Sequence, residues 1–337
     1  MRAEDLLCPG PGGLYSPLGG FHVDPTKAVP KALITHGHSD HARPGHEAVL
    51  ATAETLAIME ARYGADFARS TQAIRFHEPM KVGGATVTFV PAGHVLGSAQ
   101  IVVEHGDCRV VASGDYKRQP DSTCAGFEPV ECDVFITEAT FGLPVFRHPD
   151  AAAEIGRLID SLALFPERTH LIGAYSLGKT QRVIRLLRDA GYDKPIYLHG
   201  ASETLCRLYE SQGVALGPLA PATDNRKSRA DFAGEIVIGP SGSYDDRWSR
   251  RFADPLIIAA SGWMRVRQRA KQGGVELPLV ISDHSDWDEL CRTIRETGAG
   301  EVWVTHGREE ALVHWCRLNG IPARPLHLVG YEDEEAE

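Results

Sequence analysis

The chain has 337 residues, of which 45 are acidic and 35 are basic, and its formal net charge is −10. This length exceeds what a single hydrophobic core usually organises, so we expect one large domain or two smaller ones. The acidic balance argues against a uniformly basic nucleic-acid binder, although a local basic groove remains compatible with it.

The cysteines and the apolar runs bear on the compartment. Seven cysteines are scattered without a Cys-x-x-Cys pair, which predicts no disulfide framework and suits a reducing cytoplasm. Residues 1–20 are rich in glycine and proline and lack a signal-peptide core, and no apolar run reaches the roughly 18 residues of a membrane span. We therefore expect a cytoplasmic protein with no membrane partner and a solvated acidic tail at residues 332–337.

Residues 32–41 read Ala-Leu-Ile-Thr-His-Gly-His-Ser-Asp-His. The first four favour a buried strand, and His36, His38, Asp40 and His41 follow directly. Nitrogen ligands with one carboxylate suit Zn²⁺, with Mn²⁺ and Fe as rivals, better than Mg²⁺ or Ca²⁺. Because alternate residues of an extended segment point the same way, His36 and His38 can bind one ion while Asp40 and His41 turn towards a second. The alternative is a polar surface loop, which this density of ligand types disfavours.

Residues of ligand type also follow other expected strands. Apolar patterns predict a helix at 51–63 and strands at 85–90, 99–104, 108–113, 134–137, 279–282 and 301–305. The polar residues after these strands are His94, Asp115, Glu138, Asp283, His284 and His306. A short strand before Pro25 adds Asp24 as a residue that supports this region. The run Thr305-His306-Gly307 repeats Thr35-His36-Gly37, so we expect the two strand ends to meet at one site.

From about residue 149 the pattern changes to alternating helices and strands. Helices are expected at 150–164, 179–190 and 202–212, and strands at 169–174, 195–198 and 256–260, with a loop-rich region at 213–253. This rhythm predicts a small parallel-sheet unit inserted in the chain.

A competing motif lies inside this inserted unit. Residues 173–180 match the P-loop pattern between a strand and a helix, which predicts a nucleotide-binding protein. No strand at 134–138 or 256–261 ends in the aspartate that a P-loop site needs for Mg²⁺, which argues against it. Lys179 still stands at an expected helix N-terminus, where a nucleic-acid phosphate can bind.

Two basic runs with nearby tryptophans predict a groove for a single strand. The predicted nucleic-acid contacts in them are Arg247, Trp248, Arg250, Arg251, Arg265 and Arg267. An ordinary charged surface with a buried tryptophan is the alternative.

The chain resembles the metallo-β-lactamase superfamily and, within it, the β-CASP nucleases. The resemblance rests on His36-x-His38-x-Asp40-His41, followed in order by His94, Asp115, Glu138, His284 and His306. The runs at 92–98, 113–116 and 283–286 are similar to bacterial ligase-associated DNA exonucleases, which are typically encoded beside a DNA ligase and a helicase. This resemblance implies an α/β fold, an αββα sandwich formed by residues 1–145 and 266–331, and a β-CASP α/β insertion at 146–265.

The resemblance also implies the roles of the site residues. His36, His38, His94 and Asp115 would hold one divalent ion, and Asp40, His41, Asp115 and His306 a second, with Zn²⁺ favoured and Mn²⁺ the alternative. Asp24 would orient the ligands from behind. The expected catalytic residues are Asp40, Glu138 and His284, where His284 protonates the leaving oxygen and Glu138 holds its ring.

The implied function is a two-metal phosphodiesterase acting on nucleic acid, and specifically a DNA exonuclease in DNA repair. A ribonuclease is the alternative, because the resemblance implies that Artemis-like DNA members usually have valine at the position of His306. More distant alternatives are a small-molecule metallo-hydrolase, a P-loop nucleotide-binding protein and an inactive scaffold subunit.

Overall fold

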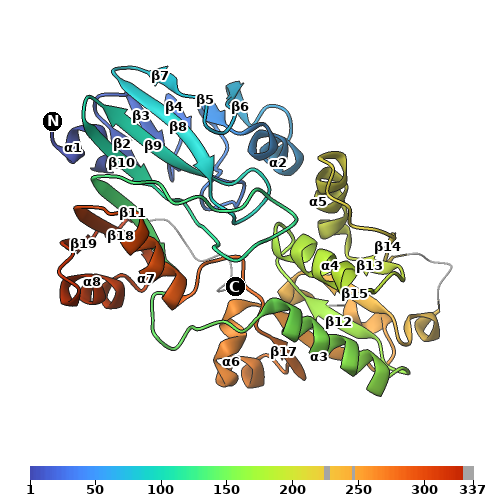
Figure 1. Cartoon of the computed structure of the whole chain (residues 1–337). Helices are drawn as coiled ribbons and strands as arrows, with labels where there is room; N and C mark the ends of the chain where they lie inside the picture. The colour runs from blue at the N-terminus through green and yellow to red at the C-terminus, as the bar shows by residue number, and fades with distance from the viewer. Residues whose placement is uncertain (224–227, 245–246, 329–337) are drawn as a thin grey trace. The chain divides into compact units, whose positions relative to one another are not determined.

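The computed structural model describes residues 1–223, 228–244 and 247–328, and the expected acidic tail at 332–337 lies outside these residues. The chain divides into two compact units (Figure 1). Of the described residues, unit 1 combines Met1–Phe146 with residues 284–328, and unit 2 lies within Arg147–Asp283. The second boundary thus falls after residue 283, whereas the sequence placed it at 265.

Unit 1 contains two mixed sheets. The first sheet is antiparallel from β1 to β3 and parallel from β3 to β6, and the second is antiparallel from β7 to β10 and parallel from β10 through β11 and β18 to β19. The strands of the first sheet, in spatial order, are β1 (Cys8–Gly10), β2 (Gly13–Ser16), β3 (Phe21–Val23), β4 (Lys31–Leu33), β5 (His46–Ala51) and β6 (Ala68–Ala73). Those of the second, in spatial order, are β19 (Ala323–Pro325), β18 (Glu301–Gly307), β11 (Val134–Ala139), β10 (Cys108–Ala112), β9 (Ala99–His105), β8 (Ala85–Pro91) and β7 (Met80–Val82).

The core of unit 1 lies between these two sheets. Buried side chains from both sheets form one hydrophobic cluster, for example Phe21 and Leu33 from the first sheet with Phe89 and Trp303 from the second. Their alternation with outward-facing side chains follows from the two-residue period of a strand. Burial of this apolar surface is the main force that holds the sheets together.

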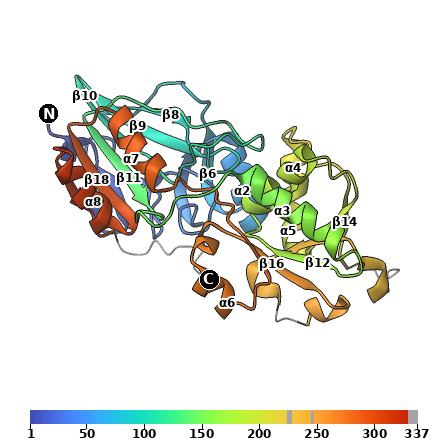
Figure 2. The same ribbon diagram turned by 60° about the horizontal axis from the view of Figure 1, so that its bottom comes forward.

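Helices cover the outer faces of both sheets. A second cluster joins β4 and β5 to α2 (Ala53–Tyr63), whose N-terminus is capped by Thr52, and a third joins β10, β11 and β18 to α7 (Trp287–Glu296) and α8 (Glu309–Leu318). Figure 2 shows α7 and α8 beside β11 and β18. A short helix, α1 (Ala3–Leu6), begins the chain.

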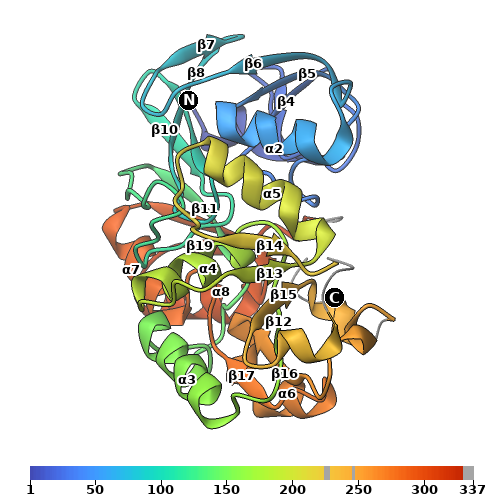
Figure 3. The same cartoon turned by 90° about the vertical axis from the view of Figure 1, so that its right-hand side faces the viewer.

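Unit 2 is built on a parallel sheet in the order β14-β13-β15-β12-β16-β17 (Figure 3). Its strands are β12 (His170–Gly173), β13 (Ile196–Leu198), β14 (Leu219–Pro221), β15 (Ile236–Gly239), β16 (Leu256–Ala260) and β17 (Leu277–Leu279). Its helices are α3 (Ala151–Leu164), α4 (Lys179–Asp189), α5 (Gly200–Ser211) and α6 (Arg267–Gln272), with 3₁₀ turns at 229–232, 241–244, 249–251 and 262–265. The βαβ rhythm of the sequence therefore yields the parallel sheet that it predicts.

Two expectations about unit 2 need correction. The region 213–253, expected to be loop-rich, contains β14 and β15, and β15 pairs with both β12 and β13 inside the sheet. The strand expected at 279–282 is instead β17, which ends at Leu279 and pairs in parallel with β16. Because β17 extends the sheet of unit 2, the chain returns to unit 1 only at His284.

The mixed α/β class is confirmed by the sheets and helices of both units. Among the helices that the structure describes, none combines the length and the apolar character needed to cross a bilayer.

Candidate metal centre

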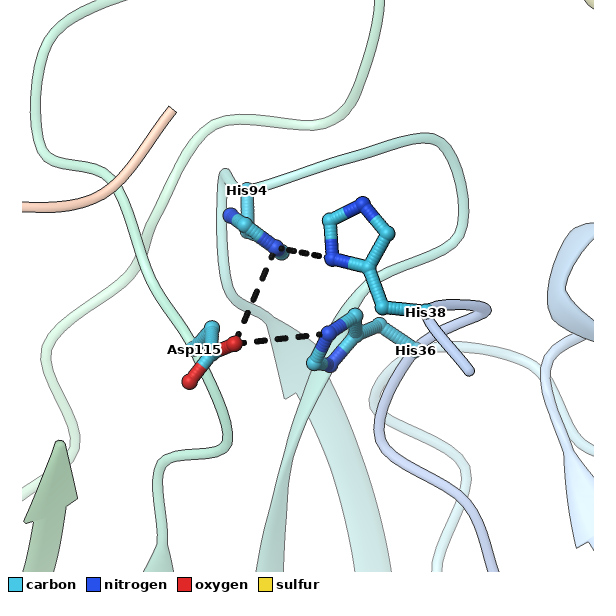
Figure 4. A group of neighbouring side chains, drawn as sticks. All are labelled: His36, His38, His94 and Asp115. Carbon is cyan, nitrogen blue, oxygen red and sulfur yellow. Dashed lines mark hydrogen bonds and ion pairs between the residues drawn. The ribbon is translucent and has the colours of Figure 1, made fainter. Parts of the chain in front are cut away.

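Four ligand side chains of unit 1 converge at the ends of its strands (Figure 4). His36 and His38 follow β4, His94 follows β8 and Asp115 follows β10, and all four are buried. One ligand atom from each lies within 4.8 Å of one atom from every other. The Nε2 of His94 is 3.0 Å from Nδ1 of His38 and 3.9 Å from Oδ2 of Asp115. Three imidazoles and one carboxylate therefore surround a single point, as Zn²⁺ ligands do.

A second group lies on the other side of Asp115. His41, Asp115 and His306 bring their ligand atoms within the same range of one another. The Nε2 of His41 is 3.3 Å from Oδ2 of Asp115 and 3.4 Å from Oδ2 of Asp40, and its ring centroid is 5.0 Å from that of His306. Asp115 belongs to both groups, so the residues present fit two neighbouring cations that share one carboxylate.

Asp24 holds this arrangement in place through its contacts with His41 and Thr35. Its Oδ2 is 2.8 Å from Nδ1 of His41 and accepts a hydrogen bond from the Thr35 hydroxyl at 2.6 Å, while its Oδ1 accepts from the Thr35 amide at 2.8 Å. The carboxylate thereby holds the Nδ1 proton of His41 and leaves Nε2 facing Asp115, as a metal-binding tautomer requires. The residue adopts a left-handed backbone with φ 44°.

The protonation states of these buried groups fit a cation. Burial, together with neighbouring His41, lowers the pKa of His36 well below its ordinary value, which keeps this imidazole neutral, the form that binds a metal. Burial also opposes the charge of Asp115, but the neighbouring His41 outweighs it and holds the pKa of that carboxyl well below its usual range. The Nε2 of His36 is buried and lies 3.5 Å from Oδ2 of Asp115, and it makes no hydrogen bond with a described residue (Figure 4).

His41 and His306 differ in their preferred charge. Burial disfavours the His41 cation, but the carboxylates of Asp40 and Asp115 overcome this and raise the pKa of His41 well above its ordinary value. Burial and the nearby His41 lower the pKa of His306 to about 3. A cation bound between them would displace the proton of His41.

Glu138 and His284 form a buried pair beside Asp115. The Nδ1 of His284 is 3.0 Å from Oε2 and 3.2 Å from Oε1 of Glu138, and Oε1 also accepts from the Tyr116 amide at 2.8 Å. Ligand atoms of Asp115, Glu138 and His284 lie within 4.8 Å of one another. The sequence placed Glu138 after a strand; it instead lies within β11, where the pairing with β18 shifts register between Thr137 and Ala139.

The predicted role of Lys179 as an exposed phosphate contact needs correction. Lys179 begins α4 but is buried, and its Nζ lies 2.8 Å from Oδ1 of Asp283. The Gly178 amide donates to Oε1 of Gln181 at 2.7 Å, and the Thr180 hydroxyl donates to the Tyr175 carbonyl at 2.9 Å. The P-loop-like run therefore uses these polar groups for its own structure rather than presenting them to a phosphate.

The predicted base-stacking role of Trp248 also needs correction. Its ring packs edge-on against His199 and Phe252, with centroids 4.8 and 5.1 Å apart, and lies over Gly239, where a Cβ would meet it at 3.1 Å. The indole thus belongs to the packing of unit 2. Arg251 donates to the carbonyls of Trp248 and Ala222, so its guanidinium serves the same fold. The other predicted contacts are exposed: Arg247, Arg250, Arg265 and Arg267.

One buried residue beside the centre was not predicted from the sequence. Lys117 stands two positions after Asp115 and is buried, with its Nζ 3.2 Å from the His284 carbonyl. Neither a ligand-type side chain nor a spacing pattern distinguishes it from the many surface lysines that sequences contain.

Curated proteins with similar sequences are larger than this chain. A probable DNA ligase from Opitutus terrae is 28% identical over 319 residues, which cover 92% of this chain and 30% of that protein. Endoribonuclease YSH1 of Gibberella zeae is 27% identical over 73% of this chain and 31% of its own length. Cleavage and polyadenylation specificity factor subunit 3 of Dictyostelium discoideum is 32% identical over 57% of this chain and 25% of its own length. The chain thus spans about a third or less of these relatives.

No family model matches the chain. Among solved structures, a protein of unknown function from Enterococcus faecalis V583 superposes with a TM-score of 0.60 at 15% identity, covering 90% of this chain and 80% of that one, which concerns the fold alone. The chain is thus similar in sequence to β-CASP nucleases of the metallo-β-lactamase superfamily, which confirms the resemblance predicted from its sequence.

Proposed function

We propose that the protein is a metal-dependent phosphodiesterase that cleaves nucleic acid. One observation carries this proposal: two groups of buried ligands share Asp115, and the Glu138–His284 pair adjoins that same carboxylate. Two cations held by such groups would activate a water molecule and neutralise charge on a phosphodiester. The filled ligand positions argue against an inactive scaffold subunit.

In this proposal His284 supplies the proton that the leaving oxygen needs. Its Nδ1 is held by the Glu138 carboxylate, so Nε2 is the ring atom left to face a substrate. Glu138 fixes the orientation of the ring, because both of its carboxylate oxygens lie within hydrogen-bond distance of Nδ1. Asp40, beside His41, completes the set of acidic groups at the second ion.

We assign the two units to the two domains that the sequence resemblance implies. We assign unit 1 to an αββα metallo-β-lactamase sandwich because both of its sheets share one core and both have helices on their outer faces. Unit 2, a parallel sheet with helices inserted between two parts of unit 1, is assigned to the β-CASP domain.

DNA is the proposed substrate, and trimming of strand ends during repair is the proposed role. The similarity to the protein named a probable DNA ligase covers 92% of this chain, against 73% and 57% for the two RNA-processing relatives. That similarity covers only 30% of the ligase-named protein, so most of that protein lies outside the region similar to this chain. A nuclease that prepares ends suits a ligase, which is the proposed partner; a helicase partner rests on the sequence resemblance alone.

A ribonuclease is the second candidate. It is favoured by the similarity to YSH1, an endoribonuclease, and by His306, a ligand atom of which lies within 4.8 Å of one from His41 and one from Asp115. Both candidates use the same ions and the same proton donor, so they differ in substrate and not in chemistry.

Backbone contacts to the strand are proposed for the exposed basic residues of unit 2. Arg265 and Arg267 lie in a segment of unit 2, residues 261–275, that contains no acidic residue, and Arg247 and Arg250 are exposed nearby in sequence. Contacts of this kind make affinity fall as salt rises.

The direct test uses labelled DNA and RNA strands, each with free or blocked ends, incubated with Zn²⁺ or Mn²⁺. We expect stepwise shortening of DNA from a free end, its loss when that end is blocked, and its abolition by a chelator. Digestion of RNA alone would overturn the DNA assignment. Activity that survives both the chelator and His284→Ala would contradict the proposed chemistry itself.

A further inference from the structure

Lys117 is a buried lysine beside the centre that the proposed chemistry does not use. Its side chain is 1% exposed, in the loop that carries Asp115. A buried ammonium is costly unless its charge and its hydrogen atoms find partners, so the partners of Lys117 indicate what it does.

Two partners of the Lys117 ammonium group belong to the segment that brings the chain back into unit 1. The Lys117 ammonium donates to the His284 carbonyl at 3.2 Å and lies 3.5 Å from Oε2 of Glu289. Glu289 is also in the first turn of α7, where Oε2 accepts from the amide of the N-cap residue Asp286 at 3.2 Å. One cation thus contacts both His284 and the start of the helix that follows it.

The backbone of Lys117 is itself fixed. Its amide donates to the Ala92 carbonyl at 3.1 Å, and its carbonyl faces Gly93 so closely that a Cβ there would lie 2.3 Å away. Gly93 has φ 75°, a conformation that suits glycine, so this close approach depends on the residue present. The backbone of Lys117 is therefore held in place while its side chain contacts His284.

A second bond ties the same two segments together. The Ser285 amide donates to the Tyr116 carbonyl at 2.7 Å, while the Tyr116 amide donates to Glu138. Glu138 holds the ring of His284, while Lys117 and Tyr116 hold the peptide group that follows its Cα, at the His284 carbonyl and at the Ser285 amide respectively. The ring needs both constraints, because a side chain is only as well placed as its backbone.

We propose that Lys117 is a positioning residue for His284: by binding the His284 carbonyl and Glu289, it fixes the proton donor relative to Asp115. The inference rests on the proposed role of His284. His284 is the first residue of unit 1 after the whole of unit 2, so its backbone lacks a preceding element of unit 1 to hold it. Lys117 supplies that anchor from the loop of Asp115.

The test compares two strands that differ only at the scissile linkage. One has natural bridging oxygens, and the other has sulfur in place of the bridging oxygen that leaves, which product analysis identifies. A sulfur leaving group departs without a proton, so a defect in proton donation appears only on the natural strand. The variants are Lys117→Met, Lys117→Arg and His284→Ala, and Lys81→Met is the control for loss of an exposed lysine.

For Lys117→Met we expect kcat on the natural strand to fall by about 10- to 100-fold, as a displaced catalytic group typically causes. We expect KM to change by less than about threefold, the metal content to remain that of the wild type, and the sulfur strand to be cleaved at nearly the wild-type rate. Lys117→Arg, which keeps the charge and the donors, should restore part of kcat, and Lys81→Met should change nothing.

Other outcomes separate the inference from the function on which it rests. Equal losses on both strands for Lys117→Met, together with a selective loss for His284→Ala, would overturn the role of Lys117 alone. Equal losses for His284→Ala would overturn the proton-donor role and the inference with it. If Lys117→Met does not fold, Glu289→Gln carries the test, because it keeps the helix cap while removing the charge that faces Lys117, and a smaller selective loss is expected.

Discussion

Asp24 and His41 show how a residue outside the ligand groups can set their chemistry. The carboxylate of Asp24 is 2.8 Å from Nδ1 of His41, on the side of the ring away from Asp115. It therefore determines which ring nitrogen carries the proton. Such partners of metal-binding histidines typically affect metal affinity by 10- to 100-fold.

The change Asp24→Asn should therefore weaken the group of His41 and His306 and spare that of His36, His38 and His94. An amide can donate its N–H to Nδ1 of His41 and so favour the tautomer whose Nε2 is blocked. Asparagine tolerates the left-handed backbone at this position, so the variant should fold. Competition with a chelating dye should show one of two ions bound about 10- to 100-fold more weakly.

The matched control is Asp150→Asn. Asp150 caps α3 in unit 2, where asparagine caps equally well, so both metal affinities should stay unchanged. Equal weakening of both ions by Asp24→Asn, or of neither, would contradict the role assigned to Asp24.

At the residue scale, the sequence predicts functional residues of types that seldom cluster by chance. It does not predict a functional residue of a type that is common on every protein surface. Histidines and acids after strands, such as His94 and Asp115, were predictable because strand ends of one sheet edge meet in space. Lys117 was not, because only its burial distinguishes it from a surface lysine. The role of Trp248 is wrongly predicted for a different reason: a tryptophan ring can stack on a base or pack in a core, and one of its ring partners here, His199, is distant in the sequence.

At the scale of elements, α2 supports the loop between His36 and His38. Ile58 and Arg62, four residues apart and hence on one face of α2, meet Gly37: a Cβ there would lie 2.5 Å from Cγ2 of Ile58, and Arg62 donates to the Gly37 carbonyl at 2.9 Å. Only a residue without a side chain permits this approach, so the helix fixes how the two histidines are presented.

Gly37→Ala should push this loop away from α2. We expect a loss of about 1 to 3 kcal/mol in the free energy of unfolding, typical of overpacking, and weaker binding of the ion held by His36 and His38. Denaturant unfolding of the metal-free protein and metal titration measure the two effects.

Two further variants make this prediction specific. Ile58→Ala alone should cost about 2 to 5 kcal/mol through the cavity that it leaves. Combined with Gly37→Ala, it should cost less than the sum of the two, because the cavity receives the new methyl group. Gly156→Ala, in the exposed face of α3 with nothing near its added Cβ, should not destabilise the protein. Strict additivity of the first two changes would contradict the proposed clash.

The element boundaries show where a local pattern is insufficient. Long apolar runs such as those of β9 and β10 were predicted within a residue or two. β15 was missed because a short apolar run inside a polar, glycine-containing region resembles a loop until its neighbours β12 and β13 are known. β17 was placed too late because residues 277–279 pair with β16, a partner that the sequence does not reveal.

At the scale of the whole molecule, the candidate ligands come from segments separated by nearly the entire chain, from His36 to His306. Unit 2 interrupts unit 1 between Glu138 and His284, so these two paired residues come from parts of unit 1 that lie on either side of unit 2 in the sequence. The order of the candidate ligand residues along the chain allowed the sequence to predict that the two parts of unit 1 meet at one site. The position of the second boundary was not predictable, because it depends on the strand pairing of unit 2.

The central claim is that this chain holds two neighbouring divalent ions that share Asp115. Anomalous diffraction from crystals grown with Zn²⁺, recorded on both sides of the zinc absorption edge, tests it most directly. We predict two zinc peaks in each chain, one contacting His36, His38 and His94 and the other contacting His41 and His306, with Asp115 touching both. A single peak, or peaks that leave Asp115 or His306 without contact, would contradict the account.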